Sequence, residues 1–159
     1  MQKQSRTEET RNLESQFKEL LQIETDTWGV YMLAAKHLKV TENELWILLE
    51  IDSCDEILCQ ADISRRLHIP AQTLNSSLMK MVRKGWIAFV PVKGSQKAKG
   101  VVLTEEGLKT MGPVLKSVHQ AEMTAFGSLD PEEAEAMLNA IRLYLTRFSE
   151  EMRALFGKE

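Results

Sequence analysis

The chain has 159 residues, of which 43% are hydrophobic and 27% charged, and its formal net charge is −3 at pH 7. This composition is that of an ordinary globular protein, and two cysteines are too few for a disulfide-rich scaffold. The apolar runs are a few residues long, against roughly 20 for a membrane span, and no signal-peptide core follows Met1. We therefore expect one cytoplasmic domain with no membrane partner.

A long first helix is predicted over residues 8–39, because apolar side chains from Leu13 to Leu38 recur at spacings of three and four. Next comes Thr41-Glu-Asn-Glu44, a capping box in which the Thr hydroxyl and the Glu carboxylate each satisfy a free backbone N–H. It opens a short helix through Ile51 that is apolar on most sides and is therefore expected to be buried.

Two short helices joined by a tight turn are predicted between residues 60 and 84. His68 tolerates the positive φ of a helix-ending position, and Pro70 suits the first turn of the following helix. Gly85 ends the second helix. The shared core is expected to consist of Ile63, Leu67, Ile69, Leu74 and Leu78. This is the pattern of a helix-turn-helix.

A β-hairpin is predicted next, from the β-prone runs Ile87–Val92 and Val101–Leu103 around a glycine-containing loop. A hairpin directly after a helix-turn-helix is a wing. Two further helices are predicted over residues 104–157, the first capped by Thr104 and the second beginning at Asp130-Pro-Glu-Glu133. The expected fold is mainly α with a small β-hairpin wing: a winged helix-turn-helix at about 41–103 with long terminal helices.

The net charge conceals a strongly basic segment. Residues 60–103 hold eight basic residues against one acidic residue, a local charge of +7, which leaves −10 for the rest of the chain. The basic residues are Arg65, Arg66, Lys80, Arg83, Lys84, Lys93, Lys97 and Lys99. A charge run is often only a solvated surface, but here it coincides with a helix-turn-helix and a wing. Because phosphates dominate protein–DNA affinity, this combination favours double-stranded DNA as the partner.

Candidate DNA contacts follow from the pattern of the second helix of the pair. With Leu74 and Leu78 buried, the outward residues are expected to be Gln72, Thr73, Asn75, Ser76 and Lys80. Gln and Asn side chains pair bidentately with adenine, and Ser and Thr serve bases or phosphates. The loop lysines Lys93, Lys97 and Lys99 suit backbone or minor-groove contacts, and Arg65 and Arg66 are further candidate DNA-binding residues. Ordinary surface polarity is the alternative for each of these residues.

These motifs, taken in order, resemble the MarR family of winged-helix bacterial regulators. The resemblance rests on Ala61–Ile69, Met81–Ile87, Val102–Gly107 and Leu129–Ala134, and it covers nearly the whole chain. It implies a homodimer in which helices at about 8–39 and 104–157 of both chains interlock. It also implies a transcriptional regulator, more often a repressor, that binds a pseudo-palindromic operator and is released by a small molecule or an oxidant.

The wing departs from that family. Its tip usually carries Asp-x-Arg, where this chain has Ser95-Gln96-Lys97, and Ala88–Val90 is apolar where arginine is common. Lysine lacks the planar fork of arginine. This departure motivates an alternative function, a winged-helix protein-interaction module that has lost specific operator binding.

Two further groups of residues have both a structural and a functional interpretation. The first group would form either an effector pocket for a small aromatic or lipophilic compound or ordinary core packing. Its members are Trp28, Tyr31, Met32, Trp46 and His119. Cys54 and Cys59 are expected to be ordinary reduced thiols rather than a redox switch, because nearby carboxylates disfavour a thiolate. The histidines are scattered, and no catalytic, nucleotide-binding or metal-ligand spacing is present, so we expect no enzyme activity, cofactor or metal.

Overall fold

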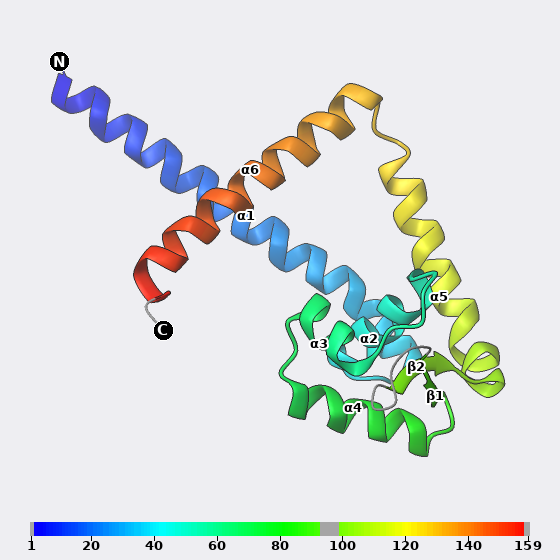
Figure 1. Cartoon of the computed structure of the whole chain (residues 1–159). Helices are drawn as coiled ribbons and strands as arrows, with labels where there is room; N and C mark the ends of the chain where they lie inside the picture. Colours follow the sequence, from blue (N-terminus) through cyan, green and yellow to red (C-terminus); the bar gives the residue numbers. More distant parts are fainter. Residues whose placement is uncertain (1, 93–98, 158–159) are drawn as a thin grey trace. The chain divides into compact units, whose positions relative to one another are not determined.

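A computed structural model describes residues 2–92 and 99–157, with side chains from residue 10 onward. Its elements are α1 Gln2–Leu38, α2 Glu42–Ser53, α3 Gln60–Leu67, α4 Ala71–Arg83, β1 Ile87–Pro91, β2 Lys99–Leu103, α5 Glu105–Phe126 and α6 Pro131–Phe156 (Figure 1). The expected fold, mainly helical with one antiparallel hairpin as a wing, is confirmed. None of the helices described here has the length and apolar character needed to cross a lipid bilayer.

Helix ends fall where local capping chemistry predicts them. Thr41 and Glu44 form the expected capping box at the start of α2, and Asp130 and Glu133 form another at the start of α6. His68 ends α3 with φ 52°, in the left-handed region. Helix α1 begins at Gln2, earlier than the predicted residue 8, because residues of good helix propensity precede the apolar stripe and continue the helix.

The chain divides into two compact units, one extending to Lys116 and one beginning at Ser117. The first unit has a single hydrophobic core, to which α2, α3, α4, the hairpin and the first half of α5 contribute. Its buried members are Ile47, Leu48, Leu58, Ile63, Ile69, Leu74, Leu78, Met81, Ile87, Val101, Met111 and Leu115. Leu67 is half-buried against this core. The predicted core of the helix-turn-helix is therefore confirmed.

The hairpin is fixed to the helical core at two points, one within β2 and one directly after it. Val101 N–H donates to the Leu58 carbonyl at 2.9 Å, so β2 also pairs with the segment before α3. The Thr104 hydroxyl donates to the Gly85 carbonyl at 2.5 Å and accepts from Gly107 N–H at 2.9 Å. A Cβ at Gly107 would overlap the Trp86 carbonyl oxygen, so only glycine permits α5 to begin this close to the hairpin.

The terminal helices leave long apolar stripes exposed. No residue of α6 is buried, although it carries an apolar residue at nearly every turn of one face. Its exposed large apolar side chains are Met137, Leu138, Ile141, Leu143, Leu145, Phe148, Met152, Leu155 and Phe156. In α1, Leu13, Phe17 and Leu21 are exposed at a spacing of four. Stable monomers rarely expose contiguous apolar surface on this scale.

Candidate nucleic-acid interface

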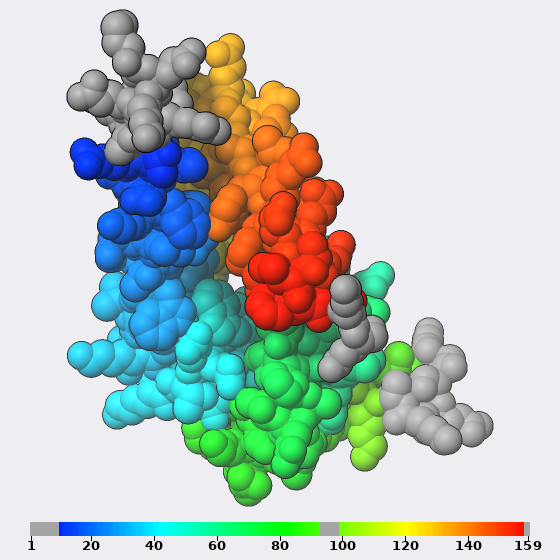
Figure 2. All heavy atoms as spheres, turned by 90° about the vertical axis from the view of Figure 1, so that its left-hand side faces the viewer, coloured from blue at the N-terminus to red at the C-terminus, as the bar shows by residue number. Residues whose placement is uncertain are grey.

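Helix α4 divides cleanly into a buried and an exposed face. Leu74, Ser77, Leu78 and Met81 point into the core of the first unit. The five residues predicted to face outward, Gln72, Thr73, Asn75, Ser76 and Lys80, are all exposed. In Figure 2 the side chains of α4, coloured green, stand out at the lower edge of the view. The helix therefore presents a polar ridge to solvent.

The polar groups on this ridge are largely free to bind a ligand. Within the described part of the chain, Gln72, Thr73, Asn75 and Lys80 form no side-chain hydrogen bond or ion pair. The Ser76 hydroxyl donates to the Gln72 carbonyl at 3.0 Å and keeps its lone pairs as acceptors. Two unpaired amides on an exposed helix can each present a donor and an acceptor to a base edge.

Two further residues, which the sequence analysis did not place here, belong to the same ridge. Arg83 lies eleven residues after Gln72, close to three helical turns, and is exposed on the same face. Met79, 39% exposed, lies between them. The helical spacing from Gln72 identifies both, although the sequence pattern placed Arg83 only among the basic residues of segment 60–103 and not on the outward face of the helix. An exposed methionine adds an apolar contact of the kind that suits a thymine methyl group.

The two arginines of α3 are already engaged within the chain. Arg65 pairs with Asp62 at 2.7 Å, although its side chain is 76% exposed. Arg66 donates to Glu50 of α2 at 2.5 Å and to Cys54 Sγ at 3.5 Å. Both side chains remain exposed, Arg65 at 76% and Arg66 at 47%, and Arg66 also links α3 to α2.

A small hydrogen-bond network between Cys59 and Asp62 caps the N-terminus of α3. The Cys59 thiol donates to Asp62 Oδ2 at 2.9 Å, and its backbone N–H donates to the same oxygen at 3.3 Å. These two hydrogen bonds, with a smaller contribution from Arg65, hold the pKa of Asp62 below its ordinary value. Both cysteines are free and half-buried. No cluster of His, Cys, Asp or Glu fit to hold a metal ion occurs in the described segments.

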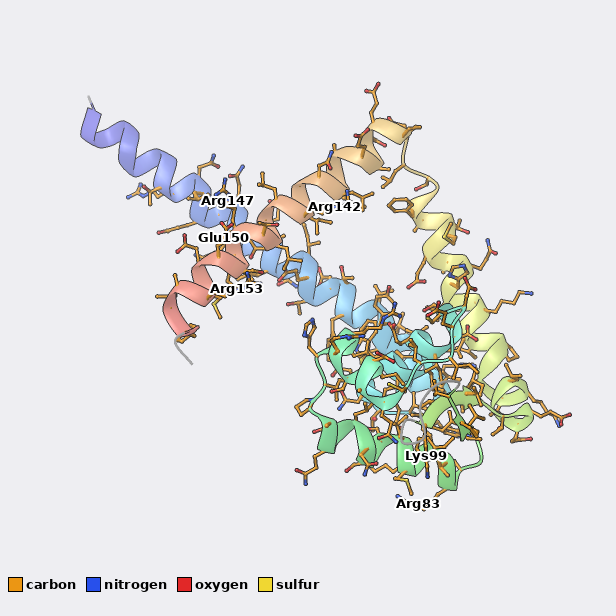
Figure 3. All side chains as sticks on the ribbon, viewed as in Figure 1. Arg83, Lys99, Arg142, Arg147, Glu150 and Arg153 are labelled. Carbon is orange, nitrogen blue, oxygen red and sulfur yellow. The ribbon has the colours of Figure 1, made fainter. Side chains whose placement is uncertain are left out.

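The wing contributes one described lysine to the basic surface. Lys99 is exposed at the start of β2, opposite Pro91 of β1. Figure 3 labels Arg83 and Lys99, which both lie at the foot of the view. Lys84 lies over the Trp86 ring, with Nζ 4.1 Å from its centroid. Lys93, Lys97 and the Ser95-Gln96-Lys97 tip lie outside the described residues.

Three of the five candidate effector residues form one cluster at the junction of α1 and α2. Trp28 Nε1 donates to Glu42 Oε1 at 2.7 Å, and Trp46 Nε1 approaches the same oxygen at 3.4 Å. The Tyr31 and Trp46 rings lie 4.7 Å apart between centroids. Met32 is half-buried in α1. His119 belongs to the second unit, where its Nδ1 lies 3.9 Å from Glu122 Oε2.

Comparisons with known proteins identify the fold. No protein-family model matches the chain, and no curated protein sequence matches it. NMB1585, a MarR family regulator from Neisseria meningitidis, aligns with TM-score 0.71 and 14% identity over 87% of this chain and 97% of that one. A Listeria monocytogenes MarR family regulator, described as putative and complexed with 26mer DNA, gives 0.66 and 15% over 90% and 95%. The S. aureus MepR–DNA complex gives 0.62 and 20% over 81% and 94%.

Proposed function

Because the chain shares the fold of the MarR-type transcriptional regulators, we propose that it is a sequence-specific DNA-binding regulator in the cytoplasm. The observation that carries the proposal is the exposed face of α4, where the unpaired amides of Gln72 and Asn75 are followed by the cationic side chains of Lys80 and Arg83. Side chains of this type read base edges in the major groove, which admits one α-helix. Helix α4 is then the recognition helix.

The distribution of charge supports this orientation. Among the described residues of the segment 60–103, six are basic and only Asp62 is acidic. The rest of the chain is acidic enough to make the whole molecule negative. The winged-helix segment then attracts phosphates, while the acidic remainder opposes non-specific adhesion.

The second part of the proposal is that two copies act together. The exposed apolar stripes of α1 and α6 need covering, and a second copy of the chain has the matching stripe. A twofold dimer presents two α4 helices to two half-sites about one helical turn apart, which predicts a pseudo-palindromic operator. A dimer bound in this way represses by occupying promoter DNA, and an effector that changes the α4 spacing releases it.

The direct test is the affinity for the DNA upstream of its own gene, compared with a scrambled duplex of the same composition, over a salt series. A specific regulator prefers the upstream duplex by about a thousandfold or more, and its affinity falls as salt rises. The altered wing tip favours one competing function, the protein-interaction module. Equal and weak binding to both duplexes would support that module and contradict the regulator.

A further inference from the structure

The junction between α1 and α2 connects the exposed apolar stripe of α1 to the winged helix. Helix α1 carries Leu13, Phe17 and Leu21 on that stripe, and α2 packs on α3 and α4 through the hydrophobic core. Only residues 39–41 separate the two helices, which belong to one compact unit (Figure 1). The angle at this junction therefore determines where the recognition helix α4 lies relative to the stripe of α1.

Apolar packing alone holds this angle weakly. Among the residues of α1 whose side chains are described, only Ala35 is buried, and Leu38 is half-buried against the core. An alanine side chain removes little apolar area from water, so it offers little resistance to a rotation of one helix against the other. Directional contacts between the two helices therefore have a large share in holding the angle.

Glu42, the first residue of α2, makes such a contact. Its Oε1 accepts from Trp28 Nε1 of α1 at 2.7 Å and from Trp46 Nε1 of α2 at 3.4 Å. The Tyr31 ring of α1 also lies against the Trp46 ring, with 4.7 Å between centroids, which is a favourable aromatic separation. Hydrogen bonds to a carboxylate are shorter and stronger than those between neutral groups. Glu42 therefore links both helices through a single oxygen atom.

The geometry of DNA makes the angle at this junction important for a dimer. Two half-sites one helical turn apart are separated by about 34 Å, and each added base pair moves one of them by about 3.4 Å and rotates it by about 34°. A protomer with a loose α1–α2 junction can follow that displacement. A protomer with a fixed junction cannot, so it binds only one half-site spacing well.

We propose that Glu42 is a positioning residue: by accepting the indole N–H groups of Trp28 and Trp46 it fixes the angle between α1 and α2, and so makes the dimer select operators by the spacing of their half-sites. Glu42 acts here through α1 and α2 and not through a contact with a base. The link between the helices does not depend on DNA, whereas the selection of spacing rests on the proposed function.

The first experiment observes the link without DNA, through the indole N–H resonances of the nitrogen-15-labelled protein. The chain has three tryptophans, Trp28, Trp46 and Trp86, so each indole gives its own peak. Glu42→Leu removes the acceptor and should shift the Trp28 peak most, the Trp46 peak less and the Trp86 peak not at all. Glu132→Leu, which alters an exposed first-turn carboxylate of α6, is the matched control and should shift none of them. An unmoved Trp28 peak in Glu42→Leu would overturn the proposed link.

The second experiment compares affinities for the specific duplex and for the same duplex with one base pair inserted or removed between its half-sites. The unaltered chain should prefer the native spacing by about tenfold or more, and Glu42→Leu should reduce this preference to about threefold or less. The affinity for an isolated half-site should not change. Glu42→Gln keeps an oxygen for the indoles and should retain the preference, as should Glu132→Leu.

Trp28→Phe is a second variant that removes the N–H and keeps an aromatic ring, so it should also lose the preference for spacing. Circular dichroism melts establish that each variant is folded, and Trp28→Phe tests the proposal even where Glu42→Leu does not fold. An unchanged preference in these variants, or an equal loss of affinity at every spacing, would overturn the proposal. A protein that binds no duplex specifically would refute the proposed function and the selection of spacing with it, while the indole peaks still test the link between α1 and α2.

Discussion

Leu145 of α6 offers the sharpest test of the proposed dimer, because the same helix contains a matched control. Leu145 is 58% exposed and belongs to the apolar stripe, whereas Leu143 is 60% exposed and lies about 200° around the helix. Full burial of a leucine is worth about 1.5–3 kcal/mol, so covering the exposed part of Leu145 contributes about 1 kcal/mol in each protomer. Leu145→Ala should therefore cost the dimer about 2 kcal/mol, or about 30-fold in its dissociation constant.

Sedimentation equilibrium over a range of concentrations measures this constant. The unaltered chain should sediment as a dimer of the 18.1 kDa protomer at micromolar concentration. Leu143→Ala should stay within about 0.5 kcal/mol of it, as a surface substitution does. An unaltered chain that is a monomer at all concentrations, or an equal weakening of the dimer by the two alanine variants, would refute the proposed dimer.

Three further predictions concern the winged-helix unit. Asn75→Ala should relax discrimination at a single operator position by about 1–3 kcal/mol. Lys80→Ala should instead weaken binding to every duplex and reduce the slope of log affinity against log salt concentration by about 1. Competition binding with single-base operator variants distinguishes the two outcomes. Leu78→Ala leaves a cavity at a fully buried position and should lower the free energy of unfolding in urea by about 2–5 kcal/mol. A smaller decrease would mean that the core collapses around the cavity. The carboxylate of Asp62 has a lowered pKa because Cys59 donates to it, so it stabilises the fold above the ordinary pKa of aspartate and loses that effect as the pH falls through its folded value. Asp62→Ala should therefore melt at a lower temperature than the unaltered chain at pH 7, with the two curves converging below about pH 4, and a gap independent of pH would exclude this origin.

Local chemistry made the elements of the fold predictable. The capping boxes at Thr41 and Asp130 need only residues three apart, so their sequence patterns specify where α2 and α6 begin. The turn between α3 and α4 is predictable for the same reason, because His68 and Pro70 lie close together in the sequence. The outward face of α4 follows from its apolar period alone, which is why its exposed residues were predictable.

The contacts between elements were not predictable in this way. Glu42 receives an indole from Trp28, fourteen residues away, and Arg66 reaches Glu50, sixteen residues away. Nothing in the local pattern of α2 pairs its carboxylates with those partners, because the pairing depends on how the helices pack. For that reason Arg66 was predicted as a DNA contact, without the ion pair that holds α3 to α2.

The central claim is that a twofold pair of α4 helices reads one specific DNA site. A hydroxyl-radical footprint of the protein on the DNA upstream of its own gene tests this most directly. We expect two protected patches related by a dyad, with centres about 10 base pairs apart, and their loss when Asn75 and Gln72 are both replaced by alanine. Uniform protection along the duplex, or none at protein concentrations that saturate non-specific binding, would contradict it.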